Sequence, residues 1–351
     1  MARPVRARDI GLACGSLAAG ELNSIADVPG VRVGHRTLIG GDIRTGVTAV
    51  IPHGGNLYRE KPVAAVQVLN GFGKSAGLVQ VEELGSIETP ILLTNTLSVG
   101  TCCTALVRHA IEQNPDIGRE TATVNPLVFE CNDGYLNDIQ ALAVTEADAR
   151  AALAEASTHV DVGSVGAGCG MSTFGFKGGI GTSSRRLDLD GQRFHLGVLV
   201  LPNFGRPGDL RLPDGRVVAP AKAQSDGDVA EKGSIIIVAA TDIPLNDRQL
   251  KRVIRRSGVG LARLGSFWGH GSGDIALGFT TANLIAHDQT ADIVGCRMLN
   301  ENRIDRLFEA MADATQEAVL DALVAAGSMT GRAGHHRSSL LDALNSPLSD
   351  A

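Results

Sequence analysis

The sequence predicts an α/β protein in which strands and helices form layers around a large core, and three observations favour this class. Short runs of Val, Ile and Leu alternate with longer segments whose apolar residues repeat with helical spacing. The 351 residues are 44% hydrophobic and 20% charged, as in globular proteins. The 43 glycines exceed the usual share and indicate many turns and close contacts. At roughly 150 residues per domain, the chain forms either two domains or one large layered unit.

Composition and charge argue against two classes of partner. A net charge of −6 and an aromatic content of 3% do not fit a nucleic-acid-binding surface, which needs basic patches and rings that stack on bases. No apolar run approaches the roughly 18 residues of a membrane span, so we expect no membrane association. No apolar stretch near the N-terminus has the length of a signal peptide.

The cysteines and histidines have no metal-binding spacing. Neither Cys-x-x-Cys nor His-x-x-x-His occurs, and adjacent Cys102 and Cys103 have poor geometry for a disulfide or a metal. We therefore expect reduced, mostly buried thiols, no metal, no cofactor and a cytoplasmic location.

The first half of the chain predicts strands that end in polar loops. Short strands fill residues 24–51, and further strands cover Ala64–Asn70, Ile91–Asn95 and Leu127–Glu130, with a helix from Thr101 to Glu112. Glu130 ends the last of these strands, and Asp133 and Tyr135 lie in the loop that follows it. Asn132-Asp133-Gly134 is also an ordinary turn sequence, so a structural role for this loop stays open.

The second half predicts further strands, separated by helices and one polar segment. A helix capped by Thr145 is followed by a glycine-dense span and then by strands at Arg193–Leu201 and Ser234–Ala240. Helices are expected from Asn246 to about Leu264 and from about Arg303 to Ala326, and residues 206–232 form the best candidate linker. Asn203, at a strand exit, is either a turn former or an amide donor for a developing oxyanion.

The stretch from Trp268 to Asn283 carries the strongest chemical signal. Ile275, Leu277 and Phe279 alternate with small residues as in a strand, and Ser272 lies between two glycines at the start of this strand. One interpretation is a glycine-rich turn. The other is a nucleophile, which needs a base. Cleavage between Gly271 and Ser272 would create an α-amine of pKa near ~8, so a single residue would supply both groups.

Several motifs together resemble one family. His-Gly-Ser-Gly-Asp-Ile at 270–275, Asp-Val-Pro-Gly-Val-Arg-Val-Gly-His at 27–35, Asn-Asp-Gly-Tyr-Leu-Asn-Asp at 132–138 and Met-Thr-Gly at 329–331 are similar to the DmpA family of L-aminopeptidase D-alanine-esterase/amidases, which includes β-peptidyl aminopeptidases. The resemblance implies an N-terminal-nucleophile hydrolase with an αββα sandwich of stacked mixed sheets flanked by helices. It also implies one hydrolase domain, self-cleaved into residues 1–271 and 272–351.

The resemblance also assigns roles to site residues. Ser272 would be the nucleophile, and Tyr135 would stabilise the oxyanion, together with Asn203 if that residue acts as the amide donor that its strand-exit position allows. Thr315 and Glu317 in the last predicted helix would hold the new amine, with Thr315 in place of the family's Ser. A threonine on a helix can instead bond to its own backbone. Glu130 or Asp133 would bind the ammonium group of a substrate.

These assignments predict a serine aminopeptidase that acts on small peptides, amides or esters and forms a homo-oligomer of two-chain protomers. Two alternatives stay open. One is a hydrolase of ω- or β-amino-acid amides, similar to nylon-oligomer hydrolases. The other is a non-catalytic protein whose glycine loops bind a small ligand.

Overall fold

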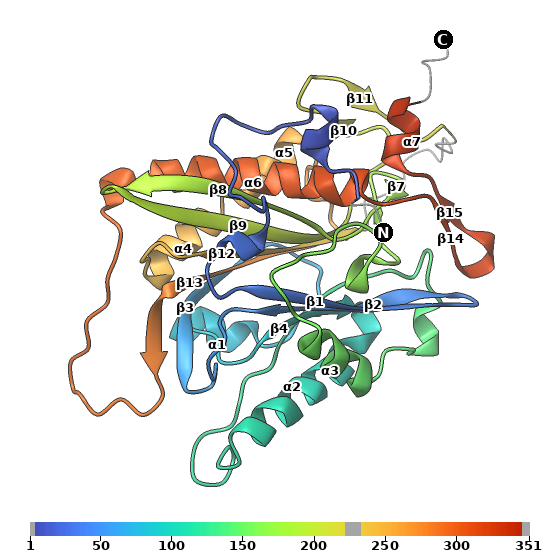
Figure 1. Ribbon diagram of the computed structural model, residues 1–351. Coiled ribbons are helices and arrows are strands. Elements are labelled where there is room, and N and C mark those ends of the chain that lie inside the picture. The colour runs from blue at the N-terminus through green and yellow to red at the C-terminus, as the bar shows by residue number, and fades with distance from the viewer. Residues whose placement is uncertain (1–3, 222–232, 346–351) are drawn as a thin grey trace.

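Two β-sheets lie face to face at the centre of the computed structural model, which describes residues 4–221 and 233–345 (Figure 1). The first sheet has the order β1-β2-β4-β5. Its strands are β1 (Arg32–Gly40), β2 (Ile43–Ile51), β4 (Ile91–Asn95) and β5 (Leu127–Cys131). Every residue of β4 and β5 is buried, which explains why these strands read as continuous apolar runs rather than alternating ones.

The second sheet has five strands in the order β3-β13-β12-β9-β8. They are β3 (Glu60–Gly71), β13 (Gly273–Ala286), β12 (Ser234–Thr241), β9 (Gln192–Asn203) and β8 (Gly181–Leu189). β13 pairs with β12 in parallel and with β3 in antiparallel orientation. The strand that follows Ser272 is therefore an interior strand, hydrogen-bonded on both sides to segments from earlier in the chain.

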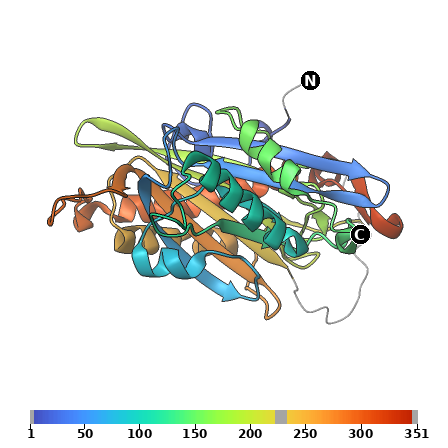
Figure 2. The ribbon, with the colours of Figure 1, turned by 90° about the horizontal axis from the view of Figure 1, so that it is seen from below.

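Helices cover the outer face of each sheet (Figures 1 and 2). α2 (Val99–Gln113) and α3 (Glu146–Ala154) pack on the four-stranded sheet. α4 (Asp247–Ile254), α5 (Ser257–Arg263) and α6 (Asp305–Val324) pack on the five-stranded sheet. The short helices α1 (Leu78–Leu84) and α7 (Leu340–Asn345) and the small hairpins β6–β7 (172–177), β10–β11 (210–218) and β14–β15 (329–337) complete the described elements.

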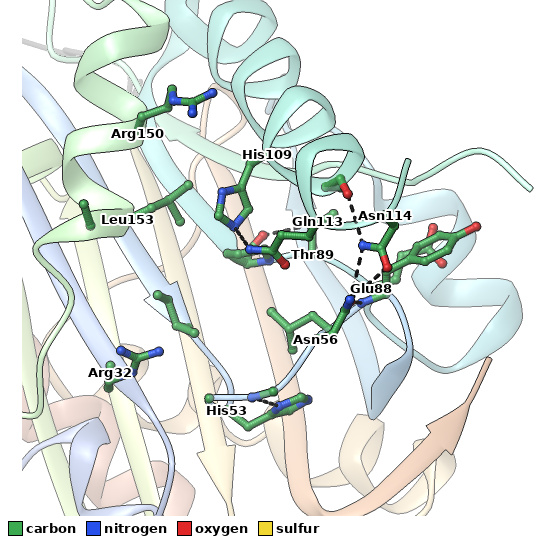
Figure 3. Close-up of a pocket in the computed structure, with 18 of the residues that line it drawn as sticks. Arg32, His53, Asn56, Glu88, Thr89, His109, Gln113, Asn114, Arg150 and Leu153 are labelled. Carbon is green, nitrogen blue, oxygen red and sulfur yellow. Dashed lines mark hydrogen bonds between the residues drawn. The ribbon is translucent and has the colours of Figure 1, made fainter. Parts of the chain in front are cut away.

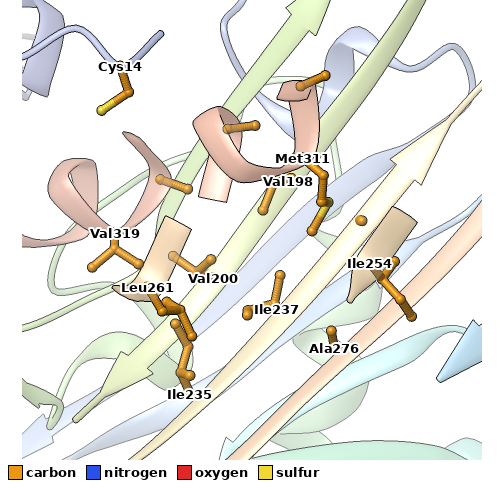
Figure 4. Packing of buried hydrophobic residues seen from close by; sticks show 14 of the residues in the cluster. Cys14, Val198, Val200, Ile235, Ile237, Ile254, Leu261, Ala276, Met311 and Val319 are labelled. Atoms are coloured by element: carbon orange, nitrogen blue, oxygen red, sulfur yellow. The ribbon is translucent and has the colours of Figure 1, made fainter. Parts of the chain in front are cut away.

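Three apolar layers hold this arrangement together. One lies between α2, α3 and the first sheet, and a second lies between the two sheets, where Phe129 and Leu93 meet Leu199 and Leu277. The third lies between the second sheet and α4 to α6; Figure 4 shows Val198, Ile237 and Ala276 of the strands in one cluster with Leu261 and Met311 of the helices. The order helix, sheet, sheet, helix confirms the predicted αββα sandwich.

The structure also corrects some predicted boundaries. The helix expected from Asn246 to Leu264 is two helices, because the chain bends at Arg255 and Arg256 between them. Part of the predicted linker forms the β10–β11 hairpin, and its residues 222–232 lie outside the described residues. Thr145 caps α3 in a capping box with Asp148, as the sequence predicts. Within the described ranges, no helix has the length and apolarity to cross a membrane.

Candidate active site

Ser272 ends a tightly held turn immediately before β13. Its backbone nitrogen donates to the Gly269 carbonyl at 2.9 Å, and the Asn70 side chain donates to the same carbonyl at 2.7 Å. Trp268, at the entry to the turn, has φ 55°, a left-handed conformation that a bulky residue adopts only where the surroundings impose it. The peptide bond between Gly271 and Ser272 is therefore held in a fixed, unusual loop.

Three strands of the second sheet have one end close to Ser272: β13 and β12 begin there, and β9 ends there. Gly273 pairs with Ser234 at the start of β12, and Ser234 pairs with Asn203 at the end of β9. β5 of the first sheet ends nearby, because the Cys131 thiol contacts the Leu201 carbonyl at 3.2 Å. The sheet stacking thus brings the loop after β5, which carries Tyr135, to the same edge as Ser272.

The Ser272 hydroxyl is buried and donates to Asp274. The distance from Ser272 Oγ to Asp274 Oδ1 is 2.6 Å, and the two side chains are 1% and 0% exposed. Ser272 precedes β13, so strand alternation alone does not pair it with Asp274. Asp274 was not predicted as a partner of Ser272, and the only signal for it in the sequence was its position two residues after the predicted nucleophile.

Glu130 lies close to the start of β13. Its Oε1 accepts a hydrogen bond from the Lys74 backbone nitrogen at 2.8 Å, and its Oε2 accepts one from the Thr96 hydroxyl. A Cβ on Gly73 would lie 3.7 Å from Glu130 Oε1 and 3.8 Å from the Gly273 Cα, so the carboxylate and the strand border the same small space.

Asp133 points into the protein instead. It is 1% exposed, and its Oδ1 accepts a hydrogen bond from Asn137 Nδ2 at 3.0 Å, while its Oδ2 has no hydrogen-bond partner. Burial raises the pKa of this carboxyl to about 7, although hydrogen bonds from Thr45 and Asn137 oppose the rise. Of the two acidic residues predicted to bind an ammonium group, Glu130 is the one that borders the space at the start of β13.

Tyr135 and Asn203 line a cavity of about 610 Å³ at the edge where the strand ends meet. The cavity also reaches Gly233, whose carbonyl accepts a hydrogen bond from the Gly273 nitrogen at 3.2 Å. The Tyr135 ring stacks on His335, with 4.6 Å between ring centroids, and Arg337 covers its other side. Asn203 Nδ2 donates to the Asn132 carbonyl at 2.9 Å. The structure thus places both predicted oxyanion donors on one cavity, whose wall includes Gly233 but not Ser272 itself.

Thr315 and Glu317 have other partners. The Thr315 hydroxyl donates to the Met311 carbonyl of its own helix at 2.7 Å, the backbone bond that the sequence left open as an alternative. Glu317 lies on α6 and accepts hydrogen bonds from Arg8, Arg185 and Asn23. In the part of the chain that the structure describes, neither side chain is hydrogen-bonded to Ser272. Burial raises the pKa of Glu317, but the Arg8 hydrogen bond and the Arg185 charge outweigh this and hold it below its usual value.

A separate cavity of about 700 Å³ lies between α2, α3 and the β2–β3 connection (Figure 3). Its walls include His53, Asn56, His109 and Asn114, and His109 is hydrogen-bonded to Gln113 at 3.0 Å. None of the predicted site residues lines it. Among the described residues, no group of three or more His, Cys, Asp or Glu side chains has an arrangement that could hold a metal ion.

Comparisons with known proteins cover nearly the whole chain. A model of peptidase family S58 matches residues 23–337. Beta-peptidyl aminopeptidase BapA of Sphingosinicella microcystinivorans is 38% identical over 354 residues, which cover 94% of this chain and 88% of that protein.

Solved structures agree with the sequence relatives. The PH0078 protein of Pyrococcus horikoshii OT3 is 46% identical, with a TM-score of 0.91 and 96% of each chain covered. The L-aminopeptidase D-Ala-esterase/amidase of Ochrobactrum anthropi is 35% identical, with a TM-score of 0.86 and 95% of each chain covered. That enzyme is described as a prototype for the serine aminopeptidases and as a new variant among the Ntn hydrolase fold.

Proposed function

The chain belongs to peptidase family S58 and is a peptide hydrolase with the Ntn hydrolase fold, and we propose that it is an aminopeptidase that activates itself by cutting between Gly271 and Ser272. The observation that carries the proposal is the position of Ser272, in a fixed turn at the head of interior strand β13. The next residue, Gly273, is hydrogen-bonded to Gly233 in the wall of the cavity that Tyr135 and Asn203 line. Family membership also shows that the hypothesis of a non-catalytic ligand-binding protein is wrong.

In the cut enzyme, Ser272 supplies both nucleophile and base. The new α-amine has a reference pKa near ~8, so a useful neutral fraction exists at neutral pH and accepts the hydroxyl proton as Oγ attacks the substrate carbonyl. The acyl group is transferred to Oγ, the amine product leaves, and water then hydrolyses the ester. Tyr135 and Asn203, which line the adjacent cavity, are the candidate donors to the oxyanion.

Glu130 is the better candidate for the ammonium group of a substrate. Its carboxylate borders the space beside Gly73 and Gly273, whereas Asp133 is turned toward Asn137. A carboxylate that binds the substrate ammonium there would select substrates with a free amino terminus. Thr315 and Glu317 stay predictions as holders of the new amine, and their contacts in the uncleaved chain give this role no support. The homo-oligomer and the cytoplasmic location also stay predictions.

Denaturing electrophoresis with intact mass and N-terminal sequencing tests self-cleavage. The wild-type chain should give two pieces, residues 1–271 and 272–351, with serine as the new N-terminus. The Ser272→Ala variant should stay one chain and should not hydrolyse peptides. Two pieces from that variant, or full activity from an uncut wild-type chain, would reject the proposal.

A preference for β-amino-acid substrates is the second candidate. It is favoured by the 38% identity to a beta-peptidyl aminopeptidase over almost the whole chain. A panel of p-nitroanilides with L-α, D-α and β-amino acyl groups, each with a free or an acetylated amino terminus, separates the possibilities. An aminopeptidase of either type loses the acetylated substrates, and the ratio of kcat/KM for β over α acyl groups decides between them.

A further inference from the structure

Self-cleavage, as proposed above, poses a problem of proton transfer that the cut enzyme does not have. The α-amine that serves as base is still an amide nitrogen in the uncut chain, and an amide nitrogen is not a base at neutral pH. A serine hydroxyl is a poor nucleophile unless another group takes its proton. The first reaction of the chain therefore needs a different acceptor, within hydrogen-bond distance of Ser272 Oγ.

We propose that Asp274 is the general base of self-cleavage. The inference rests on the proposed function, because it concerns the step that creates the nucleophile. Asp274 Oδ1 already accepts the hydrogen bond of the Ser272 hydroxyl at 2.6 Å. Both side chains are buried, so water does not compete for the proton and the bond is stronger than at a surface.

Other titratable groups near the turn are less well placed. His270 is exposed, and its ring lies 6.5 Å from the Phe72 ring with no hydrogen bond to Ser272 within the described residues. Glu130 is occupied by the Lys74 nitrogen and the Thr96 hydroxyl, and Asp133 by Asn137. Of the acidic groups at this edge of the sheets, Asp274 is therefore the one within hydrogen-bond distance of Ser272 Oγ.

Water is the one reactant that self-cleavage needs besides the protein itself. Oγ attacks the Gly271 carbonyl carbon through a five-membered ring, and its proton passes to Asp274. The carbon–nitrogen bond then breaks, and Asp274 returns the proton to the leaving nitrogen of Ser272, which gives an ester and a free amine. Water hydrolyses the ester to the Gly271 carboxylate and the Ser272 hydroxyl, with the new amine now available as proton acceptor.

The turn geometry fits this sequence. The nitrogen that must leave donates to the Gly269 carbonyl, and Asn70 fixes that carbonyl from the side. β13 fixes Asp274 two positions further on, because the Asp274 backbone is paired with Ile235 and Asn70 on the two flanking strands. The nucleophile, the leaving nitrogen and the base are thus all held by backbone pairing, which keeps their relative positions.

Full-length chains from a short cell-free translation pulse, followed by gel and mass spectrometry, test the proposal. Asp274→Asn keeps an oxygen that can accept the serine hydrogen bond but is not a base. It should slow the appearance of the two pieces by about 100-fold or more, within the range of a lost general base. Asp274→Ala should be equally slow, and added formate should accelerate it by replacing the missing carboxylate.

Asp313→Asn is the matched control, because it makes the same isosteric change at a buried carboxylate on α6 that is paired with Arg263. It should cut at the wild-type rate. Melting curves of all variants report folding. If Asp274→Asn does not fold, the proposal is tested by the effect of formate on the cutting rate of Asp274→Ala. A cutting rate of that variant that does not change with formate overturns the proposal.

The activity of chains that have been cut separates a base from a mere support of the fold. Once the amine exists it takes over as base, so the cut fraction of Asp274→Asn should keep kcat within about tenfold of wild type, while its cutting rate falls far more. Equal losses in both reactions would overturn the assignment to the precursor step. If Asp274→Asn is cut at the wild-type rate while Ser272→Ala stays uncut, Asp274 is not the base of self-cleavage, and the proposed function still holds.

Discussion

Glu317 and Arg185 form an ion pair with no solvent exposure on either side chain, 2.9 Å between Oε2 and Nη2. Arg185 belongs to β8 and Glu317 to α6, so the pair joins the edge of the five-stranded sheet to the helix that covers it. Arg8, from the N-terminal segment, adds a second cation to the same carboxylate. This cluster, which the sequence analysis assigned to the active site through Glu317, ties three distant segments together.

Loss of the Arg185 charge should therefore cost stability. Arg185→Met removes one cation and leaves the buried Glu317 carboxylate only partly compensated, so we expect the free energy of unfolding to fall by about 3–5 kcal/mol. Chemical denaturation measures it. Arg150→Met is the control, because Arg150 pairs with Glu112 on the surface, and it should leave the denaturation midpoint unchanged. Equal midpoints for the two variants would contradict the role given to the buried pair.

The stability of the Asp133 site should depend on pH in the opposite sense from an ordinary ion-paired carboxylate. Its folded pKa of about 7 lies above the ordinary aspartate value of 3.8, so its contribution to stability is complete below the unfolded pKa and is lost as the pH rises through about 7. Asp133→Asn places an amide where Oδ2 has no partner and removes this titration. The melting temperature of the variant relative to wild type should rise from about pH 5 to about pH 8. A constant difference would contradict the prediction.

Glu130→Gln should separate substrate binding from self-cleavage. If Glu130 binds the substrate ammonium, the variant loses a charge-assisted contact, and kcat/KM for amino acid p-nitroanilides should fall on the order of 100-fold. The Gly271–Ser272 bond is an internal peptide bond without a free α-amino group for Glu130 to bind, so cutting into two chains should proceed as in wild type. Asp133→Asn serves as the control for KM and should leave it unchanged. An uncut Glu130→Gln chain would show that Glu130 acts in another way.

The structural features that the sequence predicted correctly are those that depend on a local residue pattern. The alternation after Ser272 predicted β13, and Thr145 with Asp148 predicted the start of α3. The contact of Asp274 with Ser272 does not follow from this alternation, because Ser272 lies in the turn before β13. The partners of Glu317 could not be predicted either, because Arg8 and Arg185 are 309 and 132 residues away in sequence, and only tertiary packing brings them to α6.

Close packing of α6 on β8 depends on Gly181. A Cβ at this position would lie 1.9 Å from the Ala318 carbonyl oxygen, too close for any backbone to accommodate without moving. Gly181→Ala should therefore push the helix from the sheet and lower the free energy of unfolding by about 1–3 kcal/mol. Gly40→Ala, at the end of β1, has nothing within 4 Å of the new methyl group and should be neutral in the same measurement.

The two chains produced by cleavage should stay together as one folded body. β13 and α6 both belong to residues 272–351, yet β13 pairs on one side with β3 and on the other with β12, which belong to residues 1–271. Separating the pieces would break both ladders and expose the apolar layer beneath α6. On a sizing column the cut protein should therefore elute as the uncut Ser272→Ala variant does, and the pieces should separate only at the denaturant concentration that unfolds the whole. Release of residues 272–351 under native conditions would show that the central strand is held less firmly than its pairing indicates.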